Sequence, residues 1–158
     1  MIYETLKTLH VLSIIVWVGG MVFVHFFLYP AVVRLEPPAQ LRLMHDVLGR
    51  YFRAVLVASL LTLASGVWML GRVAKQVVQS GGSFEMSMAW IIMSVLGVAM
   101  VANFMHTRFV LYKRFDRSVA AAKWTEGGVA LAQIRNWVAI NLGLGVLVLL
   151  VMLLPWSA

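Results

Sequence analysis

The 158-residue chain is 62% hydrophobic and only 12% charged, whereas a soluble domain is about half apolar and a quarter charged. This composition excludes an ordinary soluble domain. The chain has no cysteine, which excludes disulfides, thiolate metal sites and cysteine nucleophiles. Its formal net charge of +7 favours contact with the anionic headgroups of a lipid membrane in so apolar a chain, and we expect no nucleic-acid partner.

Four long stretches of the chain contain no Asp, Glu, Lys or Arg. They comprise 26 residues after Lys7, 18 after Arg53, 22 after Glu85 and 23 after Arg135. A helix needs about 20 mainly apolar residues to cross the hydrocarbon core, and it satisfies its own backbone hydrogen bonds there. We therefore predict an all-α integral membrane protein, one domain over residues 1–158, built as an up-down-up-down bundle. The predicted spans are about 5–30, 52–71, 87–108 and 135–155.

The connections between these spans are short and partly helical. Pro37-Pro38 stops one helix, and residues 39–51 are expected to form a helix that leads into the second span. The third span is expected to continue past Arg108 towards Trp124, until Gly127-Gly128 breaks the helix. Residues 80–83, Ser-Gly-Gly-Ser, predict a turn.

Loop charges predict the orientation. Segments 34–53 and 108–135 hold ten of the 13 basic residues, and the other side holds three. The positive-inside rule places the ten in the cytoplasm. We therefore expect a multi-pass protein of a bacterial inner membrane with both termini in the periplasm.

Polar residues inside the spans are costly and point to function. In the first span His10, Trp17, Met21 and His25 recur at intervals that place them on one stripe of a helix. Both histidines are thus expected to face the bundle. His10 and His25 lie about 22 Å apart along the axis, from a rise of about 1.5 Å per residue, so they cannot share one metal ion.

His25 and His106 lie at similar depth in the cytoplasmic half of two parallel spans. Neutral imidazoles on facing helices are common axial ligands of haem iron. Haem propionates prefer cations, and five arginines gather at the same end of the spans: Arg34, Arg50, Arg53, Arg108 and Arg135. A pair of haem b ligands is therefore one prediction. The alternative is that these histidines form hydrogen bonds between helices and that the arginines follow from topology alone.

His10 lies near the opposite, periplasmic surface. Four methionines are expected at similar depth: Met69, Met86, Met88 and Met152. Imidazole with thioether ligands suits Cu(I), although methionines in membrane proteins more often serve packing. A copper site at His10 is the second prediction. His45, in the segment before the second span, is expected to overhang the cytoplasmic mouth of the bundle.

Short motifs resemble the copper-resistance D (CopD-like) membrane family and the related HemJ-type protoporphyrinogen oxidases. Both have a histidine early in the first span, then Trp and Gly seven and ten residues on, as His10, Trp17 and Gly20 stand here. Three further segments resemble the later spans of the family. They are Gly66-Val67-Trp68, His106 followed by Tyr112-Lys113-Arg114, and Ile134-Arg135 to Asn141.

The resemblance implies His10 and His106 as haem or metal ligands, with Trp17, Arg135 and Asn141 near the cofactor. It implies nothing for His25 and His45. The chain departs from the HemJ pattern, since no histidine follows Leu28-Tyr29-Pro30 and the Asn-Glu-x-Pro of the last span is missing.

Three functions remain open at this point. The first is a haem b redox protein that exchanges electrons with quinone or oxidises a porphyrinogen. The second is a copper-import or copper-resistance protein without haem. The third is an accessory membrane subunit whose histidines are structural. As protein partners, either further copies of this chain in a homo-oligomer or the other subunits of a complex are open. No soluble-enzyme motif is present, and all six acidic residues lie outside the spans, so a membrane oxidoreductase is the one enzyme class left open.

The charge asymmetry gives a topology prediction. A reporter fused after Ala158 should be active only in a format that needs the periplasm, because ten basic residues hold the opposite loops in the cytoplasm. Paired fusions with a periplasmic and a cytoplasmic reporter measure this. Activity of the cytoplasmic reporter would reverse the two sides of the bundle.

Overall fold

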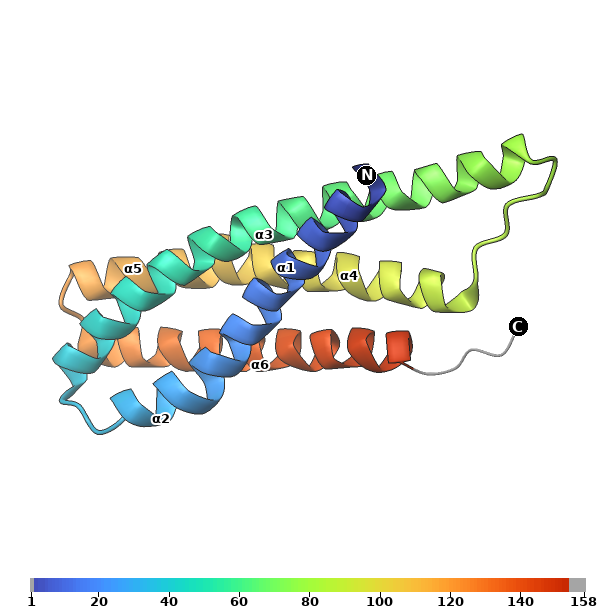
Figure 1. The fold of residues 1–158 in the computed structure, drawn as a ribbon. Coiled ribbons are helices and arrows are strands. Elements are labelled where there is room, and N and C mark those ends of the chain that lie inside the picture. Colours follow the sequence, from blue (N-terminus) through green and yellow to red (C-terminus); the bar gives the residue numbers. More distant parts are fainter. Residues whose placement is uncertain (1, 154–158) are drawn as a thin grey trace.

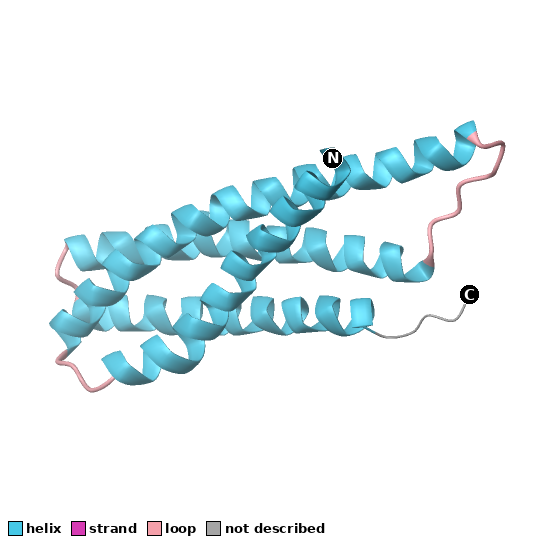
Figure 2. Cartoon of the chain, viewed as in Figure 1, coloured by secondary structure: helices cyan, strands magenta, loops and turns pink. Residues whose placement is uncertain are grey.

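The computed structural model describes residues 2–153, and every regular element in that range is a helix (Figures 1 and 2). The chain forms four long helical segments, two of which contain a π-helical stretch. The first comprises α1 (Ile2–Val22), η1 (Phe23–Leu28) and α2 (Tyr29–Val32). The second is α3 (Pro37–Gln79). The third comprises α4 (Met88–His106), η2 (Thr107–Leu111) and α5 (Tyr112–Ala120), and the fourth is α6 (Trp124–Leu153).

All four segments are long and apolar enough to cross a membrane. The all-α membrane fold predicted from the charge-free stretches is thereby confirmed, and the predicted spans fall within these helices as far as residue 153. The helices are longer than the spans. The 43 residues of α3 extend about 65 Å, at about 1.5 Å per residue, roughly twice the hydrocarbon thickness. Residues 39–51 form its first part, as predicted.

The turns between helices depend on particular residues. Pro37 and Pro38 occupy the first turn of α3, where a missing N–H costs nothing. Gly81 closes α3 with a φ of 82°, and Ala122 joins α5 to α6 with a φ of 54°. The expected helix break at Gly127-Gly128 is wrong, because α6 begins at Trp124 and continues through both glycines.

Gly127 serves close packing instead of a break. It is buried, and a Cβ atom at this position would lie 3.1 Å from Leu41 Cδ1 of α3. A glycine can therefore stand within a helix where a neighbouring helix approaches closely.

The long segments are connected alternately at the two ends of the molecule. In Figure 1, residues 33–36 and 121–123 turn at one end, and residues 80–87 connect α3 to α4 at the other. We call the first of these the basic end, since ten basic side chains come from the segments around its two turns: Arg34, Arg42, Arg50, Arg53, Arg108, Lys113, Arg114, Arg117, Lys123 and Arg135.

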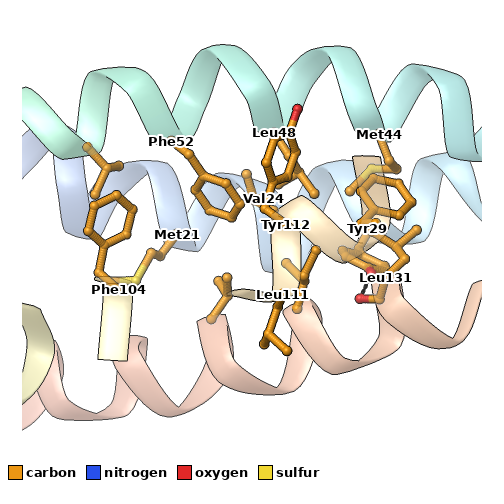
Figure 3. Close-up of a cluster of buried hydrophobic side chains, with 14 of the residues drawn as sticks. Met21, Val24, Tyr29, Met44, Leu48, Phe52, Phe104, Leu111, Tyr112 and Leu131 are labelled. Carbon is orange, nitrogen blue, oxygen red and sulfur yellow. Dashed lines mark hydrogen bonds between the residues drawn. The ribbon is translucent and has the colours of Figure 1, made fainter. Parts of the chain in front are cut away.

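A mostly apolar core joins the helices, and most of its buried side chains lie towards the basic end. Figure 3 shows Met21, Phe52 and Phe104 from three different helices meeting in it, with Leu48 and Tyr112 further along. The outward faces are also apolar, as in Ile15, which is 58% exposed. Apolar residues both inside and outside are typical of a bundle surrounded by lipid.

α1 crosses α3 at a close contact built on Gly20 and Tyr51. A Cβ atom at Gly20 would collide with the Tyr51 ring, whereas one at Gly19 has no atom within 4 Å. The Tyr51 ring cannot move away easily, because its hydroxyl donates a hydrogen bond to the Trp17 carbonyl at 2.9 Å. The two neighbouring glycines therefore have different roles.

We predict that Gly20→Ala lowers stability relative to Gly19→Ala by about 1–3 kcal/mol, the usual cost of overpacking. Both substitutions make the same change in helix propensity, so their difference isolates the contact with Tyr51. Thermal unfolding of the two variants in detergent measures it. Equal melting temperatures would show that Tyr51 moves aside without cost.

Candidate functional site

His10 lies on α1 against the middle of α3. Its Nδ1 is 2.9 Å from the Ser65 hydroxyl oxygen, and its ring covers Gly66, where a Cβ atom would lie 3.3 Å from His10 Cε1. The histidine is half-buried, and Ser65 is only 3% exposed. The small residue at 66 and the hydroxyl at 65 together fix the imidazole between the two helices.

The partners of Ser65 determine which nitrogen of His10 carries the proton. The Ser65 hydroxyl lies 2.5 Å from the Leu61 carbonyl oxygen, a distance at which two oxygens repel unless a proton lies between them. A second backbone carbonyl, that of Thr62, lies 3.2 Å from the same hydroxyl. A hydroxyl has one proton to donate and both carbonyls can only accept it, so we assign His10 Nδ1–H as the donor to Ser65. In this tautomer Nε2 carries the lone pair that can bind a metal.

Two of the methionines predicted near His10 lie on the surface of the bundle. Met88 is 61% exposed and Met152 is 68% exposed, while Met69 and Met86 are partly buried. A thioether contribution to a His10 site stays a prediction.

His25 stands in the π-helical stretch η1. Its Nδ1 is buried and has no hydrogen-bond partner. The side chain borders a small internal space together with six residues from α2, α3, α6 and η1 itself: Val24, Tyr29, Leu48, Ile134, Arg135 and Val138. Arg135 is exposed, and its guanidinium lies 5.5 Å from the Tyr29 ring centroid.

His106 is the last residue of α4, directly before η2. Its ring centroid lies 4.7 Å from that of Trp137 on α6. Trp137 points about 100° away from the α6 face that borders His25, from the helical rotation of 100° per residue. His25 and His106 thus approach different faces of α6. His25 borders the small internal space, whereas His106 does not. Their pairing across a haem stays a prediction.

His45 joins α3 to α5 at the basic end. Its Nε2 lies 2.7 Å from Asp116 Oδ1 and its Nδ1 lies 3.5 Å from Asp46 Oδ1. Its ring stacks on Tyr112 at 5.7 Å, and the Tyr112 hydroxyl donates to the His45 carbonyl at 3.0 Å. Carboxylates thus face both ring nitrogens, which favours a role in helix packing. Within residues 2–153 no group of three or more His, Asp or Glu side chains is arranged to hold a metal.

A second internal space lies nearer the centre of the bundle. Trp17 borders it, with its ring 5.9 Å from that of Phe104. Asn103 and Asn141, which are 8% and 3% exposed, border it from α4 and α6. The carboxamide oxygen of each is buried without a hydrogen-bond partner. The sequence indicated Trp17 and Asn141 as site residues, and the structure brings them together here.

Sequence reasoning missed Thr107 and Tyr51 at this space. Thr107 is 2% exposed, and its hydroxyl donates a hydrogen bond to the backbone carbonyl of Asn103 at 2.9 Å. Thr107 directly follows His106 and is the first residue of a π-helix. The direction of its side chain therefore cannot be predicted from the regular rotation of an α-helix. Tyr51 lies at the edge of a charged segment, where nothing local marks it as a core residue.

Residues 45–154 match the protein family described as Copper resistance protein D. The chain belongs to this family. The matched range is well over half of the chain and includes His106, Arg135 and Asn141, whereas His10, Trp17 and His25 precede it. No curated protein and no solved structure matches the chain. The resemblance to copper-resistance D proteins is thus confirmed, and the description of the family names copper and not haem.

The contact between Ser65 and His10 gives a spectroscopic prediction. In the wild type, His10 should be the Nδ1–H tautomer, because the Ser65 proton is held by Leu61. Ser65→Ala should remove this bias, whereas Ser59→Ala, at a buried serine that donates to Leu56, should leave it unchanged. Nitrogen-15 NMR of histidine-labelled protein reports the tautomer. An Nε2–H signal for His10 in the wild type would contradict the assignment.

Proposed function

We propose that this protein binds copper as cargo at His10 and functions in copper import or copper resistance. Membership of the copper-resistance D family carries the choice of metal. The geometry of His10 supports the location, since the contact with Ser65 favours the tautomer in which Nε2 carries the lone pair. Because His10 is half-buried, an incoming ion can reach its ring, while the buried side of the ring is shielded from bulk water.

The oxidation state that fits this site is Cu(I). Cu(I) accepts low coordination and soft or borderline ligands such as imidazole and thioether. His10 brings no negative charge, and a monovalent ion therefore needs less compensation inside a membrane than a divalent one. Met69, one turn after Ser65 on the same face of α3, is our candidate for an added thioether ligand.

The haem alternative is less well supported. Two axial histidines must face one porphyrin-sized slot, whereas His25 and His106 contact α6 on different faces. These residues do not fit a shared haem as arranged, and we derive no redox step or oxidoreductase activity from them.

The site also has a place in the proposed topology. If the ten residues of the basic end lie in the cytoplasm, as the positive-inside rule indicates, His10 lies in the periplasmic half of an inner-membrane protein. Copper arriving from the periplasm would then meet His10 before the core of the bundle. The reporter fusion after Ala158 tests this placement.

Copper binding by His10 can be measured directly on the purified protein. We predict that the wild type takes up Cu(I) from a chromogenic Cu(I) chelator and that His10→Ala weakens this binding by about tenfold or more, as for loss of a ligand or its support. His45→Ala is the matched control, because its ring is engaged by Asp116 and Asp46 at the other end.

Two outcomes would overturn the proposal. Equal Cu(I) affinity of the wild type and His10→Ala would remove His10 from the site. A colourless wild type that binds no copper would exclude the function itself. An absorbance spectrum of the same preparation tests the haem alternative, since bound haem gives a Soret band that copper(I) does not.

A further inference from the structure

Two arginines from different helical segments approach Tyr112 at the basic end. Arg53 of α3 donates from Nε to the Gly49 carbonyl at 3.2 Å. The Tyr112 hydroxyl lies against the same glycine, where a Cβ atom would be only 2.5 Å from it. The guanidinium of Arg108, in η2, lies 5.2 Å from the centroid of the Tyr112 ring. Tyr112 thus brings a cation of α3 and a cation of η2 into one neighbourhood.

Neither arginine has an ion-pair partner within residues 2–153. Asp46 and Asp116, the carboxylates whose charges act on Tyr112, contact His45 instead. The Nε atom of Arg108 is buried without a hydrogen-bond partner, and no hydrogen bond to a described residue engages the rest of its guanidinium. Because two guanidinium groups beside one tyrosine repel each other, an anion bound by both would be stabilised.

Both arginines lie where an apolar stretch of the chain ends. Arg53 precedes the 18 charge-free residues of α3, and Arg108 follows the 22 charge-free residues after Glu85. In a bilayer this is the depth at which the hydrocarbon meets the headgroups. Val57 and Leu60, four and seven residues after Arg53 on one face of α3, are 58% and 55% exposed. Cations at headgroup depth with an exposed apolar stripe beside them match the two parts of a phospholipid.

We propose that Arg53 and Arg108 form a binding site for one anionic phospholipid, with its phosphate between the guanidinium groups and an acyl chain along Val57 and Leu60. Guanidinium groups donate paired hydrogen bonds to phosphate oxygens, and basic pockets between transmembrane helices bind anionic headgroups. A zwitterionic lipid has a positive group beside its phosphate, which the two arginines repel. The inference goes beyond the proposed function and involves no copper.

The experiment measures lipid binding by the purified full chain. Native mass spectrometry in detergent counts bound lipids as dioleoyl phosphatidylglycerol or dioleoyl phosphatidylcholine is titrated in. The Gln pair, Arg53→Gln with Arg108→Gln, removes both charges of the site. The control pair, Arg114→Gln with Arg117→Gln, removes two charges from exposed residues of α5 at the same end. The Lys pair, Arg53→Lys with Arg108→Lys, keeps the charge but removes the planar fork that binds phosphate through two nitrogens.

We expect the wild type to bind the first phosphatidylglycerol molecule about tenfold more tightly than phosphatidylcholine. The Gln pair should weaken phosphatidylglycerol binding about tenfold or more, because it removes charge-assisted contacts, whereas the control pair should change it less than about twofold. The Lys pair should bind more weakly than the wild type and more tightly than the Gln pair. Circular dichroism checks that each variant is folded, and the Lys pair decides if the Gln pair is not.

Three outcomes would overturn the proposal. An equal loss of affinity in the Gln pair and the control pair would show that general attraction to the basic end retains the lipid. A Lys pair that binds like the wild type would have the same meaning, since charge alone would then suffice. Inorganic phosphate is the probe for a free anion. If it displaces phosphatidylglycerol at millimolar concentration, the site recognises phosphate alone, and the assignment to a lipid is wrong.

Discussion

The crossing of α1 over α3 at Gly20 and Tyr51 is the contact on which the placement of His10 and of the central internal space depends. Tyr51 reaches across the missing side chain of Gly20 and holds the Trp17 carbonyl with its hydroxyl. Because a Cβ atom at Gly20 would collide with the Tyr51 ring, this contact determines how closely the two helices approach at their crossing. Seven residues before Trp17, His10 meets Ser65 and Gly66, and four residues after it, Met21 enters the core beside Phe104. One tyrosine and one glycine thus position both His10 and the part of α1 that borders the central space.

The sequence predicts those features that depend on composition and regular periodicity. Charge-free stretches of 18 residues or more follow from the cost of charge in lipid, and they locate all four helices. The stripe through Trp17 and Met21 follows from the helical period, and both residues are buried, at 3% and 2% exposed. His10 shares this stripe and lies against α3 as a stripe facing the bundle requires. Regular local rules therefore determine most of the fold.

Features that depend on irregular backbone or tertiary contact escape such reasoning. η1 begins at Phe23 and changes the phase of the stripe just before His25. A pair of His25 with His106 was predicted from their similar depth and from the regular helical period. Because a π-turn is wider than an α-turn, the regular period does not predict the direction of the His25 side chain. Gly127 is a comparable case, because the same residue type breaks a helix in a loop and permits close packing against Leu41 in a bundle.

The distribution of charge separates two tasks within the molecule. Ten basic side chains belong to the segments around the turns of the basic end, where the proposed topology would bring them to the anionic headgroups. The side chains at His10 and at the space beside Asn103 and Asn141 are neutral, in keeping with the large desolvation cost that a carboxylate would carry there. Neutral side chains compensate less of the charge of a bound ion, so they favour a monovalent ion over a divalent one. Among the first-row transition metals, Cu(I) is the monovalent ion that imidazole and thioether ligands suit, which agrees with the proposed copper cargo. The same constraint that makes the chain a membrane bundle thus also narrows what it can bind.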